Sequence, residues 1–96
     1  MSEQTIKGLV QGKTSSGFGY ALPADAADNM ELLDALSDAM SENPLAISRV
    51  CRLFLGEQTR KALYDHLRQP DGRVPTAAVM ADLMEIFGAF GKAGKN

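Results

Sequence analysis

Two residue types that build chemical sites are scarce in this chain of 96 residues, which contains one cysteine and one histidine. A single cysteine, Cys51, cannot form an intramolecular disulfide. With His66 as the only histidine, the chain also cannot assemble a zinc site from Cys and His ligands. We therefore expect no metal and no cofactor.

Long apolar runs are lacking too. Nowhere do 18 apolar residues follow one another, and residues 1–5 do not show the basic and then apolar pattern of a secretory signal. We expect no membrane-spanning segment and a location in the cytoplasm.

Motifs for catalysis are missing as well. Gly12-Lys13-Thr14 resembles the end of a phosphate-binding loop, but that motif needs a glycine at the position of Lys7. Asp34 and Asp38 stand at helical spacing, which is typical of a solvated face, and no base or nucleophile accompanies them. We expect a protein that is not an enzyme.

Charge is distributed unevenly along the chain. Residues 1–48 contain two lysines and seven acidic residues, whereas residues 49–96 contain eight basic and five acidic residues. This asymmetry is compatible with a solvated surface with some internal attraction, or with two faces that meet different partners.

Residues 5–22 have the pattern of a β-hairpin. Ile6 and Val10 alternate with polar residues, Phe18, Tyr20 and Leu22 alternate with small ones, and the residues between them are turn formers. An isolated hairpin is marginally stable in water, so we expect its apolar face to pack on helices.

Four helices are predicted after the hairpin, over about 28–41, 44–55, 57–68 and 76–90. Asp28 followed by Glu31 resembles a capping box, Asn43 before Pro44 is a good helix start, and Gly56 separates the second helix from the third. In the first of these helices Met30, Leu33, Leu36 and Met40, with Leu32 beside them, form the expected buried stripe. The fold class is therefore α+β, a mostly helical single domain over 1–90 with a flexible tail at 91–96.

The last predicted helix is apolar over most of its circumference. Only Asp82 and Glu85 supply charge between residues 76 and 90. The apolar surface of this helix is compatible with two arrangements. Either all of it is core, or part of it contacts a partner or another copy of the chain, because a domain of this size rarely encloses one helix on all sides and methionine suits adaptable contacts. The predicted partner-binding residues are Val79, Met80, Leu83, Met84, Phe87 and Phe90.

A different function is suggested by the basic residues between positions 49 and 73. Helices that carry arginines can bind nucleic acid, which would make the chain a small nucleic-acid-binding regulator. Glu57, Asp65 and Asp71 interrupt the basic run, and the sequence pI is about 5.2, so the sequence favours a protein partner over nucleic acid.

Four runs between residues 42 and 75, with the segments 16–18, 29–33 and 84–87 around them, form a recognisable pattern. The runs are Glu42-Asn43-Pro44-Leu45, Leu55-Gly56-Glu57-Gln58, Lys61-Ala62-Leu63-Tyr64-Asp65-His66-Leu67 and Asp71-Gly72-Arg73-Val74-Pro75. This pattern resembles the tail assembly chaperones of long-tailed phages and prophages. The shared residues are caps, turns and core positions, and none is a catalytic signature.

The resemblance implies a non-enzymatic protein of the host cytoplasm. Such a chaperone coats the tail tape measure protein during assembly, helps to recruit tail tube subunits, and is absent from the mature virion. A homo-oligomer is compatible with this role.

Overall fold

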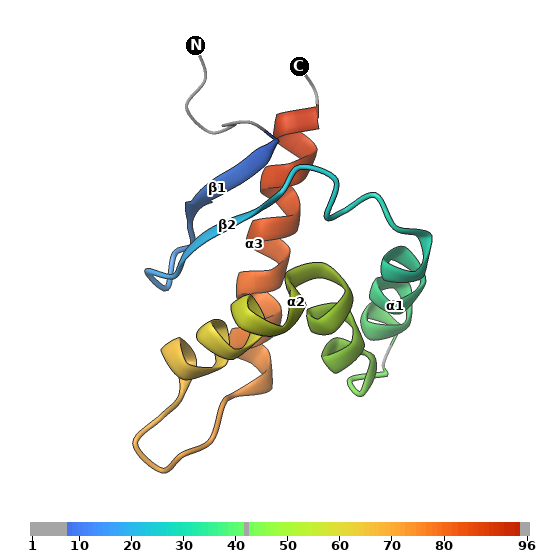
Figure 1. Cartoon of the computed structure of the whole chain (residues 1–96). Helices are drawn as coiled ribbons and strands as arrows, with labels where there is room; N and C mark the ends of the chain where they lie inside the picture. The colour runs from blue at the N-terminus through green and yellow to red at the C-terminus, as the bar shows by residue number, and fades with distance from the viewer. Residues whose placement is uncertain (1–7, 42, 95–96) are drawn as a thin grey trace.

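The computed structural model describes residues 8–41 and 43–94. The elements follow one another as β1 (Leu9–Lys13), β2 (Gly19–Pro23), α1 (Met30–Met40), α2 (Ala46–Leu67) and α3 (Thr76–Gly94), as Figure 1 shows. The two strands form an antiparallel sheet, and the remainder of this single domain is mostly helical.

The predicted hairpin is confirmed. Val10 lies opposite Leu22 in the register, and both side chains are buried together with Phe18, as the alternation of apolar residues requires. In the turn, the Thr14 amide donates to the Phe18 carbonyl at 2.9 Å, and Gly17 adopts a φ of 92° that favours glycine. Residues 5–7 of the predicted range lie outside the described residues.

Helix α1 starts at Met30, later than the sequence suggested. Asn29 is the capping residue, because its side-chain oxygen accepts a hydrogen bond from the Glu31 amide at 3.0 Å. Asp28 instead belongs to the preceding turn, where its amide donates to the Asp25 carbonyl at 3.0 Å. The predicted cap at Asp28 is therefore wrong by one residue.

The prediction of four helices is wrong, because the described residues form three. The predicted helices 44–55 and 57–68 are two limbs of the single bent element α2, joined at Gly56 with φ 78° and ψ 174°. Helix α2 also starts after Pro44, since the carbonyls of Asn43 and Pro44 accept from the amides of Ala46 and Ile47 in a turn. We call residues 46–55 the first limb and residues 57–67 the second limb.

Replacing Gly56 by alanine is expected to destabilise the fold by about 1–3 kcal/mol, because this backbone conformation is nearly restricted to glycine. A Cβ atom there would meet nothing within 4 Å, so the cost is conformational. Gly88→Ala is the matched control: Gly88 is helical, and alanine should stabilise α3 by about 0.5–1 kcal/mol. Urea denaturation followed by circular dichroism measures both, and an unchanged midpoint for Gly56→Ala would contradict the bend.

Helix α3 begins at Thr76, as predicted, but it continues to Gly94. The predicted flexible tail at 91–96 is therefore wrong for residues 91–94, which are helical, while residues 95–96 lie outside the described residues. The glycines at positions 88 and 91 do not end the helix. Single glycines lower helix stability without preventing a helix that tertiary packing supports.

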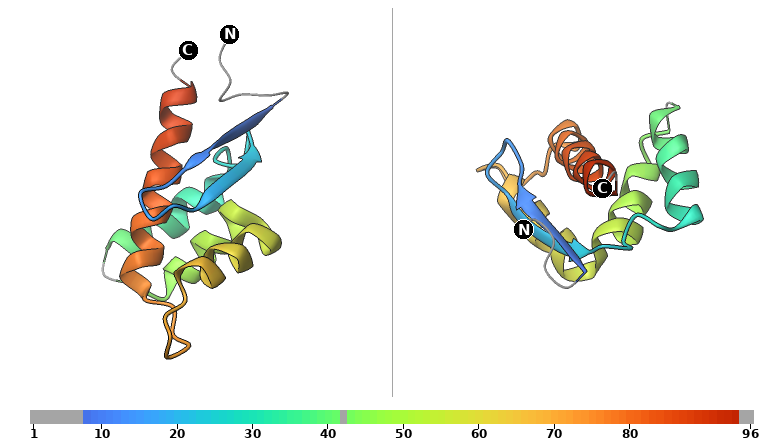
Figure 2. Two further views of the ribbon diagram at one scale, coloured as in Figure 1. Left: turned by 90° about the vertical axis from the view of Figure 1, so that its left-hand side faces the viewer. Right: turned by 90° about the horizontal axis from the view of Figure 1, so that it is seen from above.

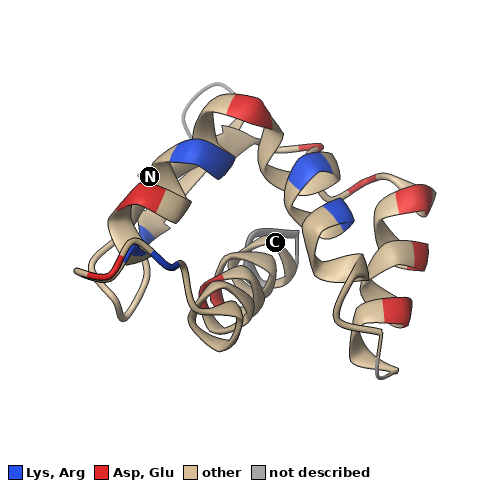
Figure 3. Cartoon of the chain, turned by 90° about the horizontal axis from the view of Figure 1, so that it is seen from below, with Lys and Arg blue, Asp and Glu red and all other residues tan. Residues whose placement is uncertain are grey.

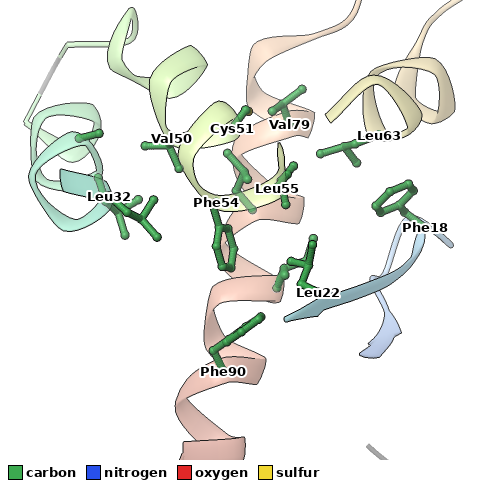
Figure 4. Close-up of a cluster of buried hydrophobic side chains, with 14 of the residues drawn as sticks. Phe18, Leu22, Leu32, Val50, Cys51, Phe54, Leu55, Leu63, Val79 and Phe90 are labelled. Atoms are coloured by element: carbon green, nitrogen blue, oxygen red, sulfur yellow. The ribbon is translucent and has the colours of Figure 1, made fainter. Parts of the chain in front are cut away.

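The helices and the hairpin meet around α2. Helix α1 packs against α2, and α3 packs against both α2 and β1. Viewed along α3 in Figure 2, the hairpin and α1 lie on opposite sides of the molecule. In the core, Leu32 of α1 lies opposite Val50 of α2, and Phe18 of the hairpin lies beside Leu63, as Figure 4 shows. Among the described residues, no helix has both the length and the apolar character needed to cross a bilayer.

Candidate partner-binding surface

The six residues predicted to bind a partner divide into two groups. Val79, Leu83 and Phe90 are buried, with exposed fractions of 4%, 1% and 9%. Met84 is exposed at 36%, and Met80 and Phe87 are half-buried. The first group forms core, so only Met80, Met84 and Phe87 are placed where a partner could reach them.

Packing on α2 explains the buried group. Phe54 of the first limb makes edge-on contacts with Phe87 and Phe90, with ring centroids 5.7 and 5.3 Å apart. Val79, Leu83 and Ile86 continue the same face of α3 at helical spacing and are enclosed by α2 and the hairpin. The fold thus covers more of α3 than its sequence suggested.

Five exposed residues of α3, none of them charged, share one sector of the helix, which we call its outward face: Ala77, Ala81, Met84, Gly88 and Gly91. The exposed Glu85 lies outside this sector and contacts the hairpin turn. The residues of the outward face are separated by four, three, four and three residues, which is the spacing of a seam where a second helix packs. Small side chains on such a seam let two helix backbones approach closely.

Helix α1 carries three of the large apolar side chains that are exposed in the described part of the chain, and the sequence analysis had expected all three to be buried. Met30, Leu33 and Met40 are exposed at 67%, 40% and 64%. The buried side of α1 consists of Leu32, Ala35 and Leu36 instead. Of the predicted buried stripe, only Leu32 and Leu36 are buried. The prediction is wrong for Met30, Leu33 and Met40, because the side of α1 that faces α2 is the one that carries Leu32.

The exposed residues of α1 also follow the spacing of a helix-packing seam. Met30, Leu33, Ser37 and Met40 are separated by three, four and three residues and are all exposed. We call these four residues the α1 stripe. The sequence contained a signal for the α1 stripe, because α1 has more apolar residues than one buried face needs.

A further exposed leucine lies at the start of α2. Leu45 is exposed at 84% and stands at the rim of an open pocket of about 380 Å³. The pocket is formed by both limbs of α2 and by the segment that leads into α3. Its lining residues are Pro44, Leu45, Ile47, Ser48, Tyr64, Arg68, Val74, Thr76 and Val79.

All four methionines in the described part of the chain reach the surface. Met30, Met40 and Met84 are exposed and Met80 is half-buried. Methionine is flexible and polarisable, and it is common on surfaces that adapt to more than one binding partner. The position of the methionines therefore indicates an adaptable binding surface.

Charge separates into an acidic and a mixed region, as Figure 3 shows. Glu31, Asp34 and Asp38 are exposed on the side of α1 that is turned away from α3. Four of the basic residues on and after α2 are paired with neighbouring acids: Arg60 and Lys61 with Glu57, Arg68 with Asp65, and Arg73 with Asp71. These pairs break up the basic run that would have suited nucleic acid.

The hairpin turn is attached to the helices by a polar network. The hydroxyls of Thr14 and Ser16 donate to Oδ2 of Asp82 at 2.9 and 2.7 Å, and the Ser15 amide donates to Glu85 at 2.9 Å. His66 Nε2 lies 2.9 Å from the backbone carbonyl of Ser16. Ser16, His66 and Asp82 are the residue types of a hydrolase triad, but here the imidazole is hydrogen-bonded to the Ser16 backbone carbonyl and the Ser16 hydroxyl donates directly to Asp82, which differs from the order of hydrogen bonds in a triad.

Cys51 is fully buried in the first limb of α2. Burial raises the pKa of its thiol, and burial also raises the pKa of Tyr64, whose hydroxyl is hydrogen-bonded to that thiol. A protonated, enclosed thiol is a poor nucleophile and a poor metal ligand. Within residues 8–41 and 43–94, no three His, Cys, Asp or Glu side chains are grouped to hold a metal ion.

Comparison of the chain with protein-family models, with curated protein sequences and with solved structures gives no match.

Proposed function

We propose that this protein is a non-enzymatic, tail assembly chaperone-like binding module. Its partners are the tail tape measure protein and the tail tube protein, which it binds in the cytoplasm of the host cell during tail assembly. The observation that carries this proposal is a pair of exposed, uncharged seams: the α1 stripe, and the row of exposed residues on the outward face of α3. A protein that keeps long helical segments soluble needs apolar surface with helix-packing spacing, and both seams supply it.

The resemblance described from the sequence gives this binding module its biological setting. The order of neighbouring genes offers a direct check, since a tube gene before this one and a very long tape measure gene after it are expected.

Co-expression with a fragment of the tape measure protein from the same genome tests the proposal. The wild-type chain is expected to move most of the fragment from the pellet to the soluble fraction. Met84→Asp and Leu33→Asp place a charge on each seam, and each should return most of the fragment to the pellet because a charge in an apolar interface is costly to desolvate. Phe87→Asp is less suitable, because Phe87 also packs on Phe54 in the core.

Ala62→Asp is the matched control, since Ala62 is exposed on the second limb of α2 and belongs to neither seam. It adds the same charge and should leave the fragment soluble. Full activity of both seam variants would contradict the proposed surface, and an insoluble fragment with the wild-type chain would contradict the proposed function.

A further inference from the structure

The exposed side of α1 presents two kinds of surface next to each other. The α1 stripe is apolar apart from Ser37, and the acidic residues Glu31, Asp34 and Asp38 occupy the adjoining sector. Helical geometry places these acids along one edge of the stripe, while the residues covered by α2 border its other edge. A partner on the stripe therefore meets negative charge on one side only.

None of these three acids forms an ion pair among the described residues. Helix α1 contains no lysine or arginine, and the ion pairs among the described residues involve only acids from positions 57, 65 and 71. Like-charged residues along one helix edge repel each other. A cation brought alongside them is attracted to each acid and also reduces the repulsion between the acids.

We propose that the α1 stripe binds an amphipathic α-helix of a partner protein, one whose apolar stripe is bordered by lysine or arginine. This inference rests on the proposed function, because it names the kind of segment that the same surface takes. The three-four-three spacing of Met30, Leu33, Ser37 and Met40 matches the side-chain rows of a packed helix, and charges at the edge of such a seam select the partner. The acidic edge repels a helix bordered by glutamate.

Two synthetic helical peptides test this assignment. Both carry the same leucine stripe, but one has lysine and the other glutamate at the flanking positions. By fluorescence anisotropy in low salt, the lysine peptide is expected to bind at least ~10-fold more tightly than the glutamate peptide, as several exposed charge pairs together would produce. The ratio should shrink as salt is raised, because exposed charges are screened.

Variants of α1 separate the two parts of the site. The double variant Asp34→Lys/Asp38→Lys changes exposed positions and should reverse the preference between the peptides. Leu33→Asp should weaken the binding of both peptides, while Ala62→Asp should change neither. Circular dichroism is used to check that each variant is folded. If Leu33→Asp does not fold, the charge-reversal variant alone tests whether the acidic edge selects the lysine peptide.

Equal affinity for the two peptides, or a preference that the charge reversal does not change, would overturn the inference. Sedimentation could instead show a salt-sensitive dimer that does not bind the peptide. In that case a second copy of this chain would cover the α1 stripe, and this result would overturn the inference as well. The outcomes distinguish this inference from the proposed function. If the chain keeps the tape measure fragment soluble but does not prefer the lysine peptide, only this inference is wrong. If the chain prefers the lysine peptide but does not keep the fragment soluble, only the proposed function is wrong.

Discussion

Replacing Leu83 by alanine is expected to lower the free energy of unfolding by about 2–5 kcal/mol, because it leaves a cavity in the core. Leu83 is 1% exposed and belongs to the cluster that joins α3 to α2 and the hairpin. A loss of this size lowers the melting temperature of a domain this small by on the order of 10–25 °C. Urea denaturation followed by circular dichroism measures the change.

The neighbouring residue supplies the control. Met84 is exposed at 36% on the outward face, so Met84→Ala should change stability by less than about 1 kcal/mol. Sequence reasoning gave both residues the same partner-binding role, and this pair of variants distinguishes a core residue from a surface residue. Similar small effects for both would show that α3 is not packed on that face.

Asp82→Ala is expected to detach the hairpin turn from α3. Asp82 is 3% exposed and accepts the hydroxyls of Thr14 and Ser16. Hydrogen bonds to a charged group contribute about 1.5–3 kcal/mol each, and part of this gain offsets the burial of the carboxylate, so we expect a loss of about 2–4 kcal/mol. The measurement is hydrogen exchange, in which the amides of β1 and β2 should lose protection more than those of α1.

Glu85→Ala serves as the comparison for this variant. Glu85 is exposed and accepts one hydrogen bond, from the Ser15 amide, so its removal should cost about 0.5–1.5 kcal/mol. If Asp82→Ala leaves the exchange of the hairpin amides unchanged, the network does not hold the turn.

The elements with a clear period were predictable from sequence. The alternation of Val10, Phe18 and Leu22 with small or polar residues gave the hairpin and its buried face. The start of α3 was predicted as well, whereas the burial of Leu83 was not, because the sequence analysis assigned this residue to the partner-binding surface.

The orientation of α1 was not predictable in the same way. Leu32 and Leu33 are adjacent, and the helix has apolar residues over more than one sector, so its sequence allows several faces to be buried. The contact with α2 decides that Leu32, Ala35 and Leu36 turn inward, and this contact is a tertiary feature. The most exposed part of the candidate site was missed for this reason.

Two other features depend on tertiary structure or on a rare conformation. Gly56 was expected to end a helix in the left-handed conformation, but its ψ of 174° lets the chain bend and resume a second limb. The contacts of Asp82 with Thr14 and Ser16 join residues more than 60 positions apart, and no local pattern announces them.

Methyl NMR of the protein labelled at its methionine, leucine and valine methyl groups tests the binding surface most directly. On addition of a soluble fragment of the tape measure protein, the methyl signals of Met30, Met40 and Met84 are expected to shift, because these side chains are exposed on the two seams. Signals of the buried Leu63 and Val50 should stay in place. Binding that leaves all three methionine signals unchanged and instead perturbs the amides of residues 57–73 would contradict the account.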